Sequence, residues 1–283
     1  MPELPEIEIL TRHLRPILRG KIIRGVTVRR RKVLSPTTPR NFERTLIGAK
    51  ITDLTRRGKY ILFRLNSSSS AGRVTMLGHL GMTGRMFLSK KGSRLPKHAA
   101  VVLHLGENNF IYEDTRYFGR LTLDTKAVEK LGPEPLSADF QPATFHAALK
   151  RSRQPIKVKL LDQTLVAGIG NIYASEALFR ARISPRLAAK RLSAAQAGRL
   201  RRSIRAVLTE AIARGSTLPL NFGDGKSDQL FYFGRAPDAP DHYEERLRVY
   251  ARDGEPCLIC RRPIERIIQA ARSTFYCPRC QRA

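Results

Sequence analysis

The first residues of the chain, Pro2-Glu3-Leu4-Pro5-Glu6, have the composition of an active site built on the N-terminus itself. Removal of Met1 would leave Pro2 with a free secondary amine. The pKa of an α-amino group lies near ~8, so part of it is neutral and nucleophilic at neutral pH. Such an amine can attack a sugar carbon and form a Schiff base. Glu3 is the adjacent candidate for a proton donor or acceptor, and Glu6 follows near the same end of the chain.

The same residues also fit the start of a helix. Proline is favoured at the first helical position, and acidic residues are favoured in the first turn. Ile7, Leu10, Leu14 and Ile17 recur at helical spacing and predict a helix over about 5–18. Taken by themselves, these residues indicate a helix start more strongly than a catalytic amine, so the rest of the chain must decide.

All four cysteines lie near the end of the chain, in two Cys-X-X-Cys pairs. The spacing of Cys257, Cys260, Cys277 and Cys280 is typical of a zinc ribbon, in which four thiolates hold one tetrahedral ion. Two disulfides would require an oxidising compartment, and no secretory signal is found. A thioredoxin-type pair would need a βαβ unit, which the pattern lacks. We therefore expect one structural Zn²⁺.

The charge of the chain is strongly positive. Fifty-two lysines and arginines face 24 acidic residues, which gives a formal net charge of +28 on 283 residues. A charge of this size on a compact fold indicates a polyanionic partner. An anionic membrane surface is the alternative, but no basic amphipathic helix with aromatic anchors supports it. A merely charged surface would explain the charge and leave the motifs unexplained.

The stretch Ala167-Gly-Ile-Gly-Asn-Ile-Tyr173 predicts a tight turn that enters a helix. Gly168 and Gly170 allow the backbone to bend and to approach another group, and Asn171 is a suitable N-cap residue. The free N–H groups of a helix start can bind phosphate. The alternative is a plain joint between two helices. Because the chain carries so much positive charge, phosphate binding is the favoured interpretation.

The order of the predicted elements indicates an α+β chain with two domains. Short, regularly spaced strands are predicted at 21–29, 51–55, 60–65, 73–79, 84–88, 99–105, 109–113 and 120–124, and they favour an antiparallel sandwich or barrel. Helices are predicted at 144–151, 155–166, 171–180 and from Ser193, which forms a capping box with Gln196, to Gly215. The domains are then 1–131, a linker 132–143, a helical domain 144–246 with a long loop at 219–246, and a zinc finger 247–283.

Five motifs together resemble the formamidopyrimidine-DNA glycosylase family, of the bacterial MutM type. They are Pro2-Glu3-Leu4-Pro5-Glu6, His79-Leu-Gly-Met82-Thr-Gly84, Asp114-Thr-Arg116-Tyr-Phe118-Gly119, Gly168-Ile-Gly-Asn171-Ile-Tyr-Ala-Ser-Glu176 and the terminal cysteine pairs. The resemblance runs through nearly the whole chain in colinear order. Leu4 favours this branch over the endonuclease VIII-like branch, which usually has glycine there.

The resemblance implies a fold and a chemistry. The fold would be an antiparallel β-sandwich with an N-terminal helix, followed by a helix-two-turn-helix module with a zinc-ribbon β-hairpin, and DNA would lie between the two domains. Pro2 would attack C1′ of the damaged nucleotide, Glu3 would act as acid or base at the sugar, and Glu6 would support the site. Lys59 would hold a phosphate beside the sugar. Oxidised purines, 8-oxoguanine or formamidopyrimidines, would be excised, and the strand would then be cut by β,δ-elimination.

The resemblance also implies how the DNA is held. His79, Lys157, Asn171 and Arg272 would contact the DNA backbone. Met82 and Phe118 would fill the gap that a flipped nucleotide leaves, and Arg116 would hydrogen-bond the orphaned base. The partner would be double-stranded DNA with damaged bases or abasic sites, bound by a monomer in the bacterial cytoplasm at the nucleoid. Zinc would be the only cofactor, with no redox group and no catalytic metal.

Some residues depart from the family pattern, and several of the site residues allow another interpretation. Without the resemblance, Met82 and Phe118 would be read as core residues, and Lys157 and Arg272 as solvated charges. For Lys59 a solvated charge, and for His79 a satisfied buried histidine, would be about as well supported as a functional role. The family usually has proline at the position of Thr115 and often arginine at Tyr117. The segment 219–246 matches the family's lesion-covering loop poorly. The rival functions are an oxidised-pyrimidine glycosylase and a non-catalytic zinc-containing DNA-binding protein.

Overall fold

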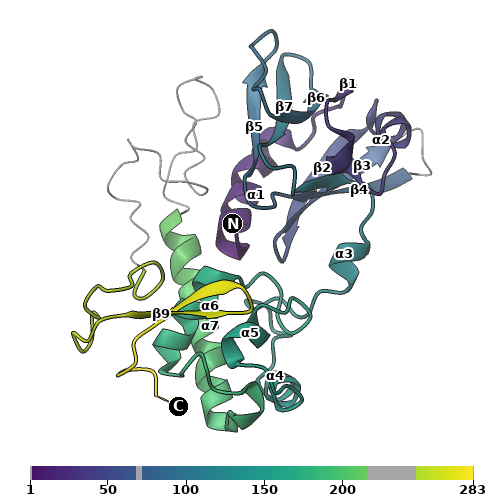
Figure 1. Cartoon of the computed structure of the whole chain (residues 1–283). Coiled ribbons are helices and arrows are strands. Elements are labelled where there is room, and N and C mark those ends of the chain that lie inside the picture. Colours follow the sequence, from purple (N-terminus) through teal and green to yellow (C-terminus); the bar gives the residue numbers. More distant parts are fainter. Residues whose placement is uncertain (1, 68–71, 216–246, 283) are drawn as a thin grey trace. The chain divides into compact units, whose positions relative to one another are not determined.

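The computed structural model describes residues 2–67, 72–215 and 247–282, which group into two compact units (Figure 1). The first, here called the sandwich unit, contains Pro2 and Glu6–Glu129. The second, the helical unit, contains Glu3–Pro5, Lys130–Arg214 and the described residues after 246. The predicted long loop at 219–246 lies outside the described residues. Within them, no helix is long and apolar enough to cross a membrane.

Two antiparallel four-stranded sheets form the sandwich unit (Figure 1). One sheet has the order β2-β3-β4-β8 and the other β1-β6-β7-β5. The strands are β1 Gly25–Val28, β2 Lys50–Arg57, β3 Tyr60–Ser67, β4 Gly72–His79, β5 Gly84–Lys90, β6 Ala99–His104, β7 Asn108–Asp114 and β8 Arg120–Thr122.

The two sheets share one hydrophobic core, which helices α1 Leu4–Leu18 and α2 Pro39–Leu46 also enter. Phe63 of β3 meets Phe110 of β7 edge to face, with the ring centroids 5.6 Å apart. The predicted apolar face of α1 supplies Leu10 and Leu14, both without exposed surface. Burial of such alternating faces is what turns a set of short strands into a sandwich.

Two loops cross between the sheets side by side. Residues 80–83 connect β4 to β5, and residues 115–119 connect β7 to β8. The pairing of His79 with Arg120 brings the start of one loop to the end of the other. The pairing of Gly84 with Asp114 does the same at their opposite ends. The topology therefore places both loops at one edge of the sandwich.

The predicted α+β class, with an antiparallel sandwich, is confirmed. Each predicted strand is present, although the one expected at 21–29 is reduced to Gly25–Val28 with an isolated bridge at Ile22. Helix α2 is an addition to the predicted elements. Its signals are a helix-starting Pro39 and the hydroxyl of Thr38, which accepts the N–H of Asn41 at 3.3 Å. The short α3, Lys126–Glu129, ends this unit, and a 3₁₀ turn, Arg31–Leu34, precedes α2.

The helical unit is built around one apolar core. Its helices are α4 Pro142–Lys150, α5 Ile156–Leu160, α6 Asn171–Ala181 and α7 Ala194–Gly215, with a 3₁₀ turn at Ala189–Arg191. The predicted capping box at the start of α7 is present. Ser193 Oγ accepts the N–H of Gln196 at 3.2 Å, and Gln196 Oε1 accepts the N–H of Ser193 at 2.9 Å.

The helix predicted over 155–166 is wrong in its second half, because α5 ends at Leu160. Asp162 Oδ1 accepts both the N–H and the hydroxyl of Thr164, at 2.9 and 2.7 Å. Gln163 donates to the carbonyl of Ile169 and accepts the N–H of Gly168. These side chains offer the backbone an alternative to helical hydrogen bonds, and a turn forms instead.

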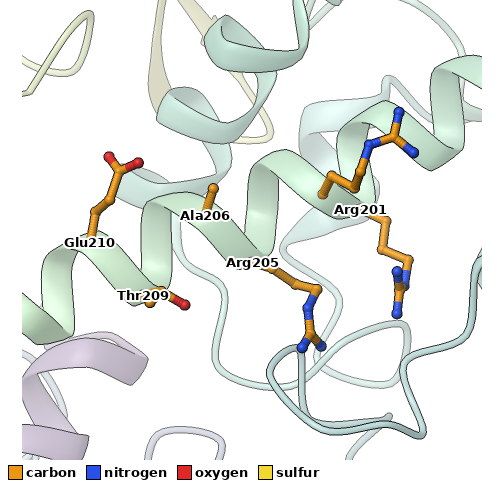
Figure 2. Close-up of a pocket in the computed structure, with 6 residues that line it drawn as sticks. Arg201, Arg205, Ala206, Thr209 and Glu210 are labelled. Atoms are coloured by element: carbon orange, nitrogen blue, oxygen red, sulfur yellow. The ribbon is translucent and has the colours of Figure 1, made fainter.

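The basic face of α7 holds the segment that precedes α4. Arg201 Nε donates to the carbonyl of Phe140 and its guanidinium lies 5.5 Å from that ring, while Arg205 donates to the carbonyls of Pro135 and Ser137. Figure 2 shows this row of side chains along one helix, where it lines a pocket of about 410 Å³. Burial, and then the neighbouring arginines, lower the pKa of Arg201.

A two-stranded hairpin of β9 Glu265–Gln269 and β10 Arg272–Tyr276 lies near the end of the chain. It packs in a small separate core that contains Phe275, Cys277 and Val249 together with Phe179 of α6. Because α6 contributes a buried ring to this core, the hairpin has a fixed place on that helix.

Candidate active site and nucleic-acid interface

The carboxylate of Glu3 caps the N-terminus of α6. Its oxygens accept the backbone N–H groups of Gly170 at 2.7 Å, Ile172 at 2.9 Å and Tyr173 at 3.4 Å. The backbone N–H of the next residue, Leu4, donates to the carbonyl of Gly168 at 3.1 Å. A helix N-terminus favours negative charge, so the positive end of α6 fixes the side chain beside Pro2.

This arrangement corrects the interpretation of the glycine motif. The group that the turn approaches is the N-terminal segment: a Cβ on Gly170 would collide with the Glu3 carboxyl carbon, and one on Gly168 would lie 2.6 Å from Leu4. Asn171 is not the N-cap, since α6 begins there and Gly170 precedes it. Three of the N–H groups that were expected to bind phosphate donate to Glu3 instead.

The other candidates for sugar chemistry are buried. Pro2 has little exposed surface, and Glu6, in the first turn of α1, is 5 % exposed. Lys59 is 7 % exposed and sits in the tight turn between β2 and β3, where Gly58 has a φ of +56°. The alternative reading of Lys59 as a solvated charge is therefore wrong.

Lys157, Asn171 and the start of β10 form one network in the helical unit. Lys157 Nζ donates to Asn171 Oδ1 at 2.5 Å, and Asn171 Nδ2 donates to the carbonyl of Ser273 at 2.8 Å. Burial, and then the positive charge of Arg272, lower the pKa of Lys157 to about 8, against an opposing effect of Glu3. Lys157 has no exposed surface, whereas Arg272 is exposed.

His79 is held as a neutral hydrogen-bond donor. Its Nδ1 accepts the N–H of Gly81 at 3.1 Å, and its ring lies against Tyr60 with the centroids 4.7 Å apart. Burial, and then the charges of Lys59 and Arg120, lower its pKa to about 4. At neutral pH the proton of the uncharged ring therefore lies on Nε2, which can donate to a phosphate oxygen.

Met82, Arg116 and Phe118 form one exposed group at the edge of the sandwich, here called the wedge cluster. Met82 is 41 % and Phe118 51 % exposed, so neither is a core residue. The guanidinium of Arg116 lies 5.0 Å from the Phe118 ring, and its Nη1 lies 3.7 Å from the Met82 sulfur. The two crossing loops thus bring together three side chains from two separate motifs of the sequence.

Tyr117, where the family often has arginine, contacts residues outside this group. It adopts a φ of +53°, and its hydroxyl accepts Arg30 Nε at 3.1 Å. The Arg30 guanidinium also lies 5.3 Å from the centre of the Tyr117 ring, and His98 lies beside the hydroxyl. A left-handed residue at this point turns the backbone between Arg116 and Phe118.

The four cysteines are arranged to hold one metal ion. Their sulfur atoms all lie within 4.8 Å of one another, with Cys257 to Cys280 at 3.9 Å and Cys260 to Cys277 at 3.4 Å. Four ligands about 2.3 Å from a zinc ion would be about 3.8 Å apart, so the set fits. With every position filled by thiolate, the one Zn²⁺ ion is structural.

Two buried acids have roles that sequence reasoning did not assign. Glu176, on α6, accepts the N–H groups of Arg248, Val249 and Tyr250 at 2.9 to 3.0 Å, and burial raises its pKa. Asp114 anchors the loop that carries Arg116. Both lie within the motifs of the family resemblance, and an acid that such a motif contains without a role in the proposed chemistry is the signal that could have found them.

Comparison with known proteins assigns the chain to a class and then to a family. The described sandwich, capped helix and cysteine hairpin define the class as a two-unit α+β protein with a zinc finger. A model of the formamidopyrimidine-DNA glycosylase N-terminal domain matches residues 1–121, one of its H2TH domain matches 131–220, and one of the zinc finger found in FPG and IleRS matches 254–283.

Full-length relatives agree with these matches. The chain is 41 % identical to the formamidopyrimidine-DNA glycosylase of Thermus thermophilus, over 99 % of this chain and 98 % of that one. It is 36 % identical to that of Listeria innocua over the whole of both. A crystal structure of MutM with DNA containing carbocyclic 8-oxo-G superimposes with a TM-score of 0.85 at 32 % identity, over all of both chains. The chain belongs to the formamidopyrimidine-DNA glycosylase family.

Proposed function

We propose that the protein is a bifunctional DNA glycosylase and abasic-site lyase of base excision repair. It removes oxidised purines such as 8-oxoguanine and formamidopyrimidines from double-stranded DNA and then cuts the strand. Relatives named formamidopyrimidine-DNA glycosylase, at 35 to 41 % identity, support the assignment, as do solved relatives bound to lesion-containing DNA. The observation within the chain that carries it is the Glu3 carboxylate, fixed by the N-terminus of α6 directly beside Pro2.

In the proposed reaction the Pro2 nitrogen attacks C1′ of the damaged nucleotide, and the bond from C1′ to the base breaks. The base leaves with the bonding electron pair and takes up a proton, while the amine loses one. Opening of the C1′–O4′ bond, with protonation of O4′, gives an iminium. Glu3 is the buried acid adjacent to the nitrogen, so it is assigned the proton transfers at the sugar.

Strand cleavage follows from the iminium, which acidifies the proton at C2′. Loss of that proton expels the 3′ phosphate, a second elimination expels the 5′ phosphate, and water then releases the sugar fragment from Pro2. Glu6 supports this site, and Lys59 holds a phosphate next to the reacting sugar. The tight turn and the buried position of Lys59 limit where its ammonium group can lie, which suits a group that must hold one particular phosphate.

The remaining candidates hold the DNA. His79, Asn171 and Arg272 donate to backbone phosphates, and Lys157, which has no exposed surface, acts by orienting the neutral amide of Asn171. Met82 and Phe118 fill the gap left by the flipped nucleotide, and Arg116 pairs with the orphaned base. The zinc ion holds the hairpin that presents Arg272. A cytoplasmic place of action, on the DNA of a bacterial cell, belongs to the same proposal because the named relatives are bacterial.

The covalent step provides the test. Borohydride should trap the enzyme on 8-oxoguanine duplex, because an iminium is reducible and a non-covalent complex is not. Pro2→Gly should lose most of the trapping and keep DNA binding. A variant whose N-terminus is extended by one residue should not be trapped at all, and equal trapping by that variant would overturn the mechanism. A duplex with an oxidised pyrimidine, run in parallel, tests the rival substrate class.

A further inference from the structure

Asp114 is a fully buried carboxylate that the proposed chemistry does not use. Four donors face it: the hydroxyl of Thr83 at 2.6 Å, the N–H groups of Gly119 at 2.8 Å and Arg116 at 3.2 Å, and the hydroxyl of Tyr112 at 3.5 Å. Within the described residues it makes no salt bridge. A buried charge held by hydrogen bonds alone is costly, which indicates that its position matters.

Three of the four donors come from the two loops of the wedge cluster, and the fourth, Tyr112, lies on β7. Thr83 follows Met82 directly, and Arg116 and Gly119 enclose Phe118. One carboxylate oxygen accepts from Thr83 and from Arg116, so it bridges the two loops with a single atom. The other accepts the N–H of Gly119, at the end of the second loop. Both loops are therefore tied to one buried group.

The backbone of the two loops is in close contact at the same place. A Cβ on Gly81, which has a φ of +61°, would lie 2.6 Å from the backbone nitrogen of Gly119. A Cβ on Gly119 would meet the Tyr112 hydroxyl and the His79 carbonyl. With glycine on both sides, the loops pack against each other without side chains, and Asp114 supplies the link between them.

We propose that Asp114 is a positioning residue that joins loops 80–83 and 115–119 into one rigid body. Met82, Arg116 and Phe118 then enter the duplex together, with their relative positions fixed before DNA arrives. The inference rests on the proposed function, since it assigns the wedge cluster to the gap in the duplex. Beyond that function, the inference explains what fixes the geometry of the wedge cluster. The residue responsible, Asp114, is fully buried and so is not assigned a contact with sugar or base.

The decisive variant is Asp114→Asn, which preserves size and removes the charge. An amide has one accepting oxygen, so its NH₂ must face either the N–H of Gly119 or the N–H of Arg116 together with the Thr83 hydroxyl. Single-turnover excision of 8-oxoguanine from duplex should fall about 10- to 100-fold, because small displacements of positioning groups have effects of that size. Lyase activity on a single-stranded abasic oligonucleotide should stay within about twofold of wild type, because there is no gap to fill.

Two further measurements separate positioning from folding. 2-Aminopurine opposite the lesion should show a smaller fluorescence increase with Asp114→Asn, since it reports unstacking by the wedge. Thr83→Val removes only the cross-loop hydrogen bond and should show the same selective loss in weaker form, whereas Thr83→Ser should behave as wild type. Asp124→Asn is the matched control, because among the described residues that carboxylate accepts only the nearby N–H of Lys126.

The outcomes are distinct. Duplex excision at the wild-type rate by a folded Asp114→Asn variant would overturn the inference, as would equal losses on duplex and single strand. If Asp114→Asn does not fold, the comparison of Thr83→Val with Thr83→Ser tests the inference. Equal rates of duplex excision by these two variants would overturn the inference. A wild-type enzyme that is inactive on both substrates would instead overturn the proposed function.

Discussion

At the scale of single residues, position 170 tolerates glycine alone, because any Cβ there would collide with the Glu3 carboxyl carbon. Gly170→Ala should push Glu3 out of the helix cap and away from Pro2. We expect single-turnover excision and borohydride trapping to fall about 100-fold or more, since a displacement of about 1 Å can have this effect. Quenched-flow rates on an 8-oxoguanine duplex give the measurement.

Gly198→Ala is the matched control for this change. Gly198 lies within α7, and a Cβ there would meet only the guanidinium of Arg202 at 3.7 Å. The substitution should stabilise the protein by roughly 0.5–1 kcal/mol and leave the rates unchanged. Wild-type rates in Gly170→Ala would show that Glu3 does not depend on the cap.

The lowered pKa of Lys157 predicts a pH effect on DNA binding. As pH rises through about 8, the folded protein loses this charge, and a nearby phosphate should restore it because the anion favours the protonated form. Binding to undamaged duplex just above this pH should therefore take up protons. Calorimetry in two buffers of different ionisation enthalpy measures the uptake, and Lys157→Met should reduce it. Equal uptake by the variant would assign the effect to another group.

The N-terminal motif shows how far residues alone can lead. Residue type and spacing identify Pro2, Glu3 and Glu6 as candidates, and the helix that starts beside them is present. The cap that Glu3 forms on α6 could not be predicted from the sequence, because Glu3 and Gly170 are 167 residues apart and no local pattern joins them. A lysine such as Lys157, without exposed surface, also looks like any solvated charge in the sequence.

At the scale of elements, the zinc hairpin should act on DNA binding from a distance. Cys257→Ser removes one of four ligands, so the metal is lost and the hairpin that carries Arg272 loses its fixed place on α6. DNA affinity should fall at least as far as it does in Arg272→Ala. Elemental analysis and fluorescence anisotropy measure the two effects.

Arg272→Ala serves as the control, because it should keep one zinc per chain and lose only the contact. A zinc-free Cys257→Ser protein that binds DNA as tightly as wild type would remove the hairpin from the DNA interface. Absence of zinc from purified wild-type protein would refute the metal site itself.

Elements with local signals are the most predictable. The start of α7 follows from Ser193 and Gln196, and the strands follow from alternation of apolar and polar residues. The end of α5 could not be predicted from periodicity, because the side chains of Asp162 and Gln163 compete for the backbone. Helix α2 has few apolar residues, so periodicity does not distinguish it from a loop.

At the scale of the whole molecule, the charge of +28 predicts a steep dependence of DNA binding on salt. Each neutralised phosphate contributes about −0.9 to the slope of log K against log salt. Lys59→Ala and Arg272→Ala should each reduce the slope by about one, while Asn171→Ala should lower affinity and leave the slope unchanged. Titrations with undamaged duplex over a series of salt concentrations give these values.

Arg202→Ala is the control, because it removes one positive charge, as Lys59→Ala and Arg272→Ala do. Arg202 is exposed on α7 and is not among the residues assigned to DNA. An unchanged slope in this variant shows that the effect belongs to particular contacts and not to net charge. A reduced slope would add the basic face of α7 in Figure 2 to the DNA interface. A flat response of the wild type would point to a partner other than nucleic acid.

The first residues of the chain are divided between the two units, and this division has a consequence for protein synthesis. Glu3–Pro5 group with the helical unit, while the chain from Glu6 to Glu129 forms the sandwich unit. Glu3 emerges from the ribosome long before the N–H groups that it caps have been made. N-terminal domains generally fold first during synthesis, and the amine of this one would then lie beside an acid that still lacks its partner. We expect a chain released early to be unable to cut DNA, so that competence for strand cleavage comes only with completion of the protein.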